Sequence, residues 1–179
     1  LLEHAPRTAS VRATSFATVL TLHQDDFQVL ASRHPELAFR LRAHVRNLQT
    51  LLRVPIFSDL PANVLRGILP RITQRRCQPG DTVVRQGERG NEFFLVQSGL
   101  LGVFVGHGDK EEKICDLGTR DYFGEIALLR DIPRTATVRC ETAVELLVLA
   151  KEDFLTLLQA SEVFATSVRA IGDTRLQRG

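Results

Sequence analysis

The chain has 179 residues, 44% hydrophobic and 25% charged, with 23 lysines and arginines against 21 aspartates and glutamates. This composition is typical of a globular protein long enough to bury one sizeable core. The formal net charge of +2 does not by itself indicate a nucleic-acid or membrane-surface partner. No run of about 18 apolar residues occurs, which excludes a membrane span in this segment.

The three cysteines, Cys77, Cys115 and Cys140, are odd in number and widely spaced. This pattern argues against a disulfide scaffold and a CxxC metal site, and it predicts a reducing setting, in the cytoplasm or at the cytoplasmic face of a membrane protein. The five histidines show no metal-ligand spacing, so we expect no metal site. Because the chain starts at Leu1 and contains no methionine, we expect a fragment of a longer chain or a processed one.

An internal repeat is present. Residues 5–12 return in similar form as residues 132–139, at an offset of 127 residues that takes Pro6 to Pro133. The offset persists downstream, where it matches Leu20 with Leu147, Leu22 with Leu149, and Asp26-Phe27 with Asp153-Phe154. A period of about one domain length indicates tandem copies, of which the chain holds only the tail of the first.

The repeat predicts three segments. Residues 1–34 are the C-terminal remnant of an upstream copy, residues 35–55 a connecting helix, and residues 56–179 the domain of the second copy. Arg7 keeps the place of Arg134 in the first copy, but no Gly-Glu pair precedes it, so we expect no ligand there.

Helical spacing of apolar residues predicts helices between residues 39 and 52 and, after Pro61, between residues 64 and 69. From residue 77 to 149 the pattern changes to short apolar runs separated by turn residues, which predicts strands. These strands lie at residues 82–84, 93–96, 100–105, 114–115, 136–138 and 144–149. Residues 110–113 mix both charges and predict an exposed hairpin tip.

Two more helices are predicted after the strands, at residues 154–158 and 164–171, with Gly172 weakening the end of the second. Phe16, Phe27, Phe154 and Phe164 are core candidates. The expected fold is α+β: an antiparallel, jelly-roll-like β-roll flanked by N- and C-terminal helices.

One segment, residues 123–137, interrupts the strand pattern. Gly124 allows a ligand to approach the backbone closely, and residues 125–129 could form a helical turn whose N–H groups favour an anion. Arg134 offers a planar fork of donors for two phosphate oxygens, and Thr135 adds a hydroxyl beside it. Glu125 suits a sugar hydroxyl. The segment therefore predicts a pocket for a ligand that is both anionic and sugar-like.

A simpler interpretation is that Glu125 and Arg134 merely pair with each other on a rim. The accompanying Gly124 and Pro133, together with the roll, favour the pocket.

The same residues carry a resemblance. Residues 123–129 and 133–137 fit, without a gap, the phosphate-binding cassette FGE(I/L)AL, spacer, (P/R)R(T/A)A(T/S). This motif is typical of the cyclic nucleotide-binding domain family of kinase regulatory subunits, nucleotide-gated channels and catabolite-activator-type regulators. Turn residues 79–81, 86–91 and 98–99 also match, and the resemblance covers roughly residues 40–175.

The resemblance implies that Arg134 binds the cyclic phosphate and Glu125 the ribose 2′-hydroxyl, with backbone of Gly124, Ile126 and Ala127 nearby. Thr135 leaves the choice between cAMP and cGMP open, and no further cofactor is implied. The implied ligand-binding residues are Phe123, Gly124, Glu125, Ile126, Ala127, Pro133, Arg134, Thr135 and Ala136.

The implied function is a sensor and not an enzyme. Ligand would draw the loop inward, pivot the helix near Lys151 and fold the last helix, about 162–177, over the base, to control an effector domain or subunit outside this chain. One alternative is a degenerate, ligand-free roll for domain–domain contact. Another is the sensor half of a catabolite-activator-type transcription regulator, with no nucleic acid contacted by this segment.

Overall fold

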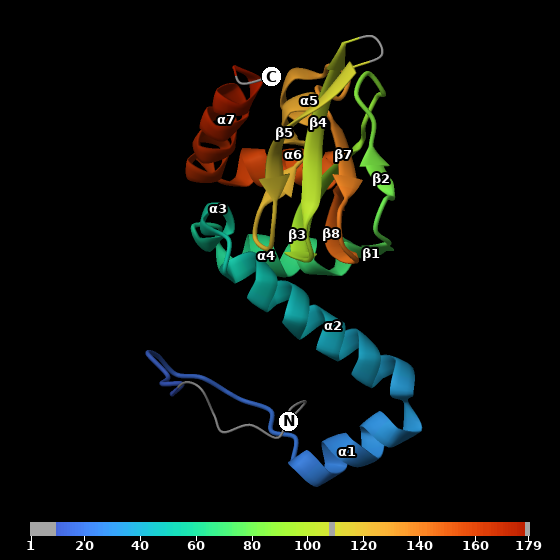
Figure 1. Cartoon of the computed structure of the whole chain (residues 1–179). Helices are drawn as coiled ribbons and strands as arrows, with labels where there is room; N and C mark the ends of the chain where they lie inside the picture. The colour runs from blue at the N-terminus through green and yellow to red at the C-terminus, as the bar shows by residue number, and fades with distance from the viewer. Residues whose placement is uncertain (1–9, 108–109, 178–179) are drawn as a thin grey trace. The chain divides into compact units, whose positions relative to one another are not determined.

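The computed structural model describes residues 10–107 and 110–177 of the chain (Figure 1). The repeated residues 5–9 of the first copy lie outside the described residues. The chain divides into two units, Leu1–Arg46 and Asn47–Gly179, and the division falls inside helix α2 (Pro35–Leu52).

The first unit contains α1 (Gln24–Arg33), in which no residue is buried. Its apolar side chains are largely solvent-exposed: Leu20 is 100% and Phe16 98% exposed. The prediction that Phe16 is a core residue is therefore wrong within this chain, because none of the described elements covers it. Phe27, also predicted as a core residue, is only half-buried.

The second unit begins with the end of α2 and the short helices α3 (Pro55–Ser58), α4 (Ala62–Ile68) and η1 (Leu69–Arg71). Two glutamines of the roll hold the end of α2. Gln74 Nε2 donates to Asn47 Oδ1 at 2.8 Å, and Gln97 Nε2 donates to Thr50 Oγ1 at 3.1 Å. These side chains fix the last turns of α2 to the roll.

The predicted β-roll is confirmed as two four-stranded antiparallel sheets, of order β1-β8-β3-β6 and β2-β7-β4-β5. The strands are β1 (Thr73–Cys77), β2 (Thr82–Val84), β3 (Glu92–Ser98), β4 (Leu101–His107), β5 (Lys110–Leu117), β6 (Tyr122–Phe123), β7 (Thr137–Cys140) and β8 (Val144–Ala150).

Alternate residues of the central strands enter two different cores, as the period of two along a strand requires. Phe94 and Val96 of β3 lie between the two sheets, with Leu146 and Val148 of β8. Their neighbours face the helices instead: Phe93, Leu95, Leu147 and Leu149. Because both faces of this sheet are covered, β3 and β8 are almost continuously apolar.

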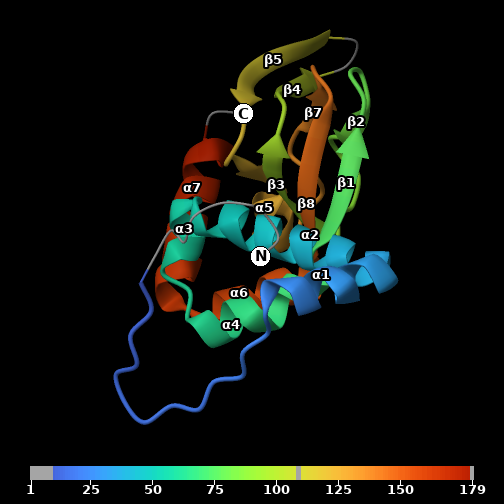
Figure 2. The same ribbon diagram turned by 90° about the horizontal axis from the view of Figure 1, so that it is seen from below.

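The helices that cover the sheet include α6 (Lys151–Ala160) and α7 (Glu162–Leu176). Ser161 separates them, and its Oγ accepts a hydrogen bond from the backbone N–H of Phe164 at 3.2 Å, as expected of an N-cap residue. Phe154 and Phe164 are fully buried, as predicted. Figure 2 shows α3, α4, α6 and α7 gathered to one side of the strands.

Three features of the strands differ from the prediction. The two-residue strand β6, which pairs with β3, was not predicted. Strand β1 was not predicted before Cys77 either, and residues 110–113 lie within β5 and not at a tip. Both are edge strands with polar, largely exposed side chains, so neither carries an apolar pattern. Their backbones nonetheless complete the hydrogen-bonded ladders with β8 and β4.

Candidate functional site

The predicted loop runs from β6 through Gly124 and the six-residue helix α5 (Glu125–Arg130) to β7. Gly124 has φ 90°, in the left-handed region, and caps α5. A Cβ atom here would lie 2.6 Å from Arg134 Nη1 and 2.9 Å from the Glu92 carbonyl oxygen. Only glycine therefore fits without strain, both for its backbone conformation and for the close approach of Arg134.

Arg134 is fixed at both its backbone and its side chain. Its N–H donates to the Glu88 carbonyl at 2.8 Å, and its own carbonyl accepts from Gly87 N–H at 2.8 Å. The guanidinium donates from Nη1 to the Gly124 carbonyl at 3.0 Å and from Nη2 to the Glu92 carbonyl at 2.7 Å. The side chain thus reaches from the loop between α5 and β7 to β3 and to the residue that caps α5.

The Arg134 guanidinium is buried, with the residue 6% exposed, and both of its described acceptors are neutral carbonyls. Burial lowers the pKa of Arg134, against the opposing influence of Glu92 and Glu125. Its carbon Cζ also lies 5.7 Å from the Phe94 ring centroid. Among the described residues no ion pair joins Arg134 to a carboxylate, so this buried cation has no directly bonded counter-charge.

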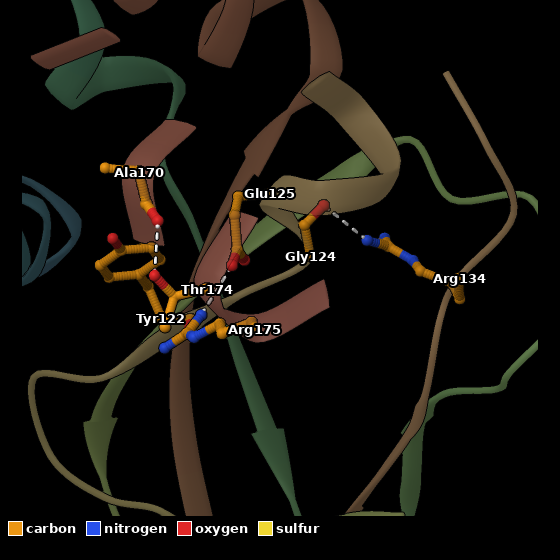
Figure 3. A network of polar contacts seen from close by, with 7 residues as sticks. All are labelled: Tyr122, Gly124, Glu125, Arg134, Ala170, Thr174 and Arg175. Atoms are coloured by element: carbon orange, nitrogen blue, oxygen red, sulfur yellow. Dashed lines mark hydrogen bonds and ion pairs between the residues drawn. The ribbon is translucent and has the colours of Figure 1, made fainter. Parts of the chain in front are cut away.

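Glu125 is directed to a different partner. Its side chain is 1% exposed, and Oε1 accepts from Nη1 of Arg175 on α7 at 2.7 Å (Figure 3). The simpler interpretation, a direct Glu125–Arg134 pair, does not hold for the described residues. The two predicted ligand-binding side chains lie on either side of Gly124, and each has its own partners.

Arg175 makes two further contacts, both with Tyr122. Its Nη1 donates to the Tyr122 carbonyl at 2.7 Å, and its Cζ lies 4.9 Å from the centre of the Tyr122 ring. Burial, with a smaller contribution from Glu125, raises the pKa of Tyr122 to about 12. The Tyr122 hydroxyl is buried and has no hydrogen-bond partner among the described residues.

Helix α7 packs closely on α5. A Cβ atom at Gly172 would lie 3.5 Å from Leu129 Cδ1 and 3.7 Å from Ile126 Cγ1, both ordinary contact distances. A second ion pair joins the same two helices, between Arg130 and Asp173. The loop that carries Glu125 is therefore in direct contact with the last helix.

The other predicted ligand-binding residues lie on the same loop as Gly124, Glu125 and Arg134. Phe123 is buried and stacked on Phe94, with ring centroids 4.7 Å apart. Ala127 is buried, and its carbonyl accepts from Ile132 N–H at 3.3 Å. Of the rest, Pro133 is exposed, and Ile126, Thr135 and Ala136 are half-buried.

Several contributors to the site were not predicted. Gly90 was recognised only as a turn glycine, yet Arg134 lies directly over it. The Glu92 carbonyl is a backbone group, which no side-chain pattern reveals. Arg175 was not predicted, because the sequence indicates the last helix by the spacing of its apolar residues, and a charged residue near the helix end carries no such signal.

No group of side chains suited to holding a metal ion occurs within residues 10–107 and 110–177. In the same part of the chain, no helix is long and apolar enough to cross a membrane.

Comparison with protein-family models, curated proteins and solved structures gives matches that agree with one another. Residues 74–161 match the family described as cyclic nucleotide-binding domain. The chain is 34% identical to the cGMP-dependent protein kinase, isozyme 2 forms cD5/T2, of Drosophila melanogaster, over 88% of this chain and 17% of that protein. It is 33% identical to the cAMP-dependent protein kinase regulatory subunit of Yarrowia lipolytica, over 88% of this chain and 40% of that protein.

Among solved structures, the catabolite activator protein of Thermus thermophilus matches with a TM-score of 0.61 and 31% identity, over 69% of this chain and 58% of that one. The chain thus spans less than two thirds of each of these three proteins. The two antiparallel sheets, the cassette sequence and the family match agree. The chain therefore belongs to the cyclic nucleotide-binding domain family, through a domain that includes residues 74–161.

Proposed function

We propose that this domain binds cAMP or cGMP, with Arg134 holding the cyclic phosphate and Glu125 the ribose 2′-hydroxyl. The observation that carries the proposal is the buried Arg134 guanidinium, whose two described acceptors are neutral carbonyls. A buried charge without a counter-ion is unfavourable, and an entering phosphate would relieve this by forming charge-assisted hydrogen bonds. A guanidinium has five N–H donors, and the two described bonds leave donors for the ligand.

The rest of the predicted site would surround the ligand. Backbone of Gly124, Ile126 and Ala127 lies next to Glu125 along the chain, and Thr135 offers a hydroxyl beside Arg134. Phe123, Pro133 and Ala136 complete the proposed set. No metal or further cofactor takes part in the proposal.

The test is calorimetric titration of the chain with cAMP and with cGMP. Removing one partner of a buried, charge-assisted contact costs about 2–5 kcal/mol, so Arg134→Ala should weaken binding roughly 30- to 4,000-fold. Arg66→Ala is the control, because Arg66 is an exposed arginine on α4 whose described hydrogen bond goes to its own helix. An Arg134→Ala protein that binds both nucleotides as tightly as the unaltered chain would refute the assignment.

The domain would act as a sensor and not as a catalyst. Because Glu125 contacts α7 directly, ligand at the loop would change the position of α7 and, through it, of an effector domain or subunit outside this chain. Ligand shifts such an equilibrium only by its differential affinity for the two states. The three cysteines, which are widely spaced along the sequence and form no disulfide within the described part of the chain, support a cytoplasmic setting.

For the domain organisation, we propose residues 56–179 as the cyclic nucleotide-binding domain, residues 35–55 as the connecting helix, and residues 1–34 as the end of an upstream copy. The structure of the repeat supports this. Adding the offset of 127 to the bounds of α1 gives those of α6, and adding it to the first residue of α2 gives the first residue of α7. Leu20 is fully exposed, whereas its equivalent Leu147 is fully buried, as expected if the sheets that would cover Leu20 belong to the missing part of the upstream copy.

A further inference from the structure

The carboxylate of Glu125 is almost inaccessible to solvent, with 1% of the side chain exposed, and its described partner is Arg175. The pair is formed by Nη1 and Oε1 at 2.7 Å. The same nitrogen donates to the Tyr122 carbonyl at 2.7 Å, and the guanidinium plane lies near the Tyr122 ring. The Tyr122 carbonyl and the Tyr122 ring thus fix the position of the Arg175 guanidinium, which in turn binds the Glu125 carboxylate (Figure 3).

A carboxylate accepts hydrogen bonds at two oxygens. The described bond uses Oε1, which leaves Oε2 as the acceptor for a sugar hydroxyl. Where Oε2 points depends on the rotation of the carboxylate, and the guanidinium sets this rotation. An acceptor displaced by a fraction of an ångström or by tens of degrees forms a markedly weaker hydrogen bond.

We propose that Arg175 is a positioning residue for recognition of the ribose: it orients Glu125 so that the free oxygen accepts the 2′-hydroxyl of the nucleotide. This inference rests on the proposed function of Glu125. It places α7 directly behind the group that distinguishes a ribose from a 2′-deoxyribose. The preference for ribose then depends on α7 being docked, and sugar recognition and helix position become one coupled property.

The alternative is that Arg175 has a purely structural role, which predicts no change in the preference for ribose when Arg175 is replaced. Arg175 could simply tie α7 to α5, as the Arg130–Asp173 pair does between the same two helices. Arg130 and Asp173 are about half-exposed, at 50% and 54%, and neither bonds to Glu125 in the described contacts. Arg130→Ala therefore removes an ion pair between α5 and α7 without altering the partners of Glu125, which makes it a matched control.

The experiment is calorimetric titration of the unaltered chain and of Arg175→Ala, Arg175→Lys and Arg130→Ala with cAMP and with 2′-deoxy-cAMP. The unaltered chain should prefer cAMP by roughly tenfold or more, as expected for one hydrogen bond to a charged group. Arg175→Ala should reduce this preference to about twofold or less by weakening cAMP binding selectively. Arg175→Lys should restore part of it, and Arg130→Ala should keep the full preference whatever its effect on affinity.

Equal weakening of both ligands by Arg175→Ala, with the preference kept, would overturn the inference and leave Arg175 as a helix tie. If Arg175→Ala does not fold by circular dichroism, Arg175→Lys decides the same question, because an unchanged preference there means that guanidinium geometry does not set the preference. An unaltered chain that binds neither nucleotide refutes the proposed function itself, which is a distinct result.

Discussion

A Cβ atom on Gly90 would lie 2.0 Å from Nε of Arg134 and 2.2 Å from its Cζ. The guanidinium therefore occupies the space that any other residue at position 90 would fill. The loop between β2 and β3 and the loop between α5 and β7 are complementary at this point, because Gly90, which has no side chain, faces the long side chain of Arg134. The position of Arg134 depends on Gly90 as much as on its own sequence neighbours.

Gly90→Ala should displace Arg134 from the carbonyls of Glu92 and Gly124. Because real side chains do not tolerate a contact of 2.0 Å, either the loop or the guanidinium must move. We expect cyclic nucleotide affinity to fall by about tenfold or more, since a misplaced guanidinium loses charge-assisted bonds worth over about 1.4 kcal/mol. Gly118→Ala is the control, because no atom lies within 4 Å of a Cβ there. Equal calorimetric affinities for the two variants would contradict the prediction.

Tyr122 should make the stability of the domain fall at alkaline pH. Burial raises its pKa from 10.0 to about 12, so the unfolded chain releases the phenolic proton at lower pH than the folded domain does. The stabilisation is complete below pH 10, and up to about 3 kcal/mol is lost as the pH rises through about 12. Tyr122 is the one tyrosine of the chain, so tyrosinate absorbance reports it alone.

Tyr122→Phe separates this effect from that of Cys140, whose pKa burial also raises to about 12. The variant removes a buried hydroxyl without a described partner, so we expect it to fold stably at neutral pH. Its stability should decline less steeply with alkaline pH than that of the unaltered chain, as measured by urea unfolding at several pH values. If the free energy of unfolding falls equally steeply with pH in the variant and in the unaltered chain, the raised pKa of Tyr122 is not the cause of the alkaline loss of stability.

Gly172→Ala should stabilise α7. The added methyl group would make ordinary contacts of 3.5–3.8 Å with α5, and no positive φ is present at this glycine. Alanine is favoured over glycine in a helix interior by up to about 1 kcal/mol. The midpoint of thermal unfolding should rise, and amide exchange in α7 should slow. A lower midpoint would mean that α5 and α7 are packed too tightly to accept a methyl group.

Leu147 and Leu20 occupy equivalent places in the repeat but should respond differently to truncation. Leu147 is fully buried between β8 and the helices, so Leu147→Ala should cost about 2–5 kcal/mol. Leu20 is 100% exposed, so Leu20→Ala should leave the unfolding transition of the domain unchanged. Denaturant unfolding measures both. A comparable loss at Leu20 would contradict the proposal that residues 1–34 lie outside the domain of residues 56–179.

Much of the fold follows from local sequence. The short apolar runs at residues 93–96 and 144–149 predict the central strands, and these become β3 and β8 with one face in each core. Apolar residues at helical spacing predict the middle of α6 and of α7, at residues 154–158 and 164–171, and both helices extend further at each end. The edge strand β1 and the first half of β5 were not predicted, because backbone pairing fixes them and their exposed side chains need no apolar pattern.

The sequence by itself determined the chemistry of the cassette: a glycine, a carboxylate and a guanidinium on one short loop, since these residues are neighbours along the chain. Only the tertiary structure decided their partners. Arg134 reaches the Glu92 carbonyl across 42 positions, and Glu125 meets Arg175 across 50. Such pairings depend on how β3 and α7 pack against the loop, and no local pattern specifies which residue of a distant element will lie opposite.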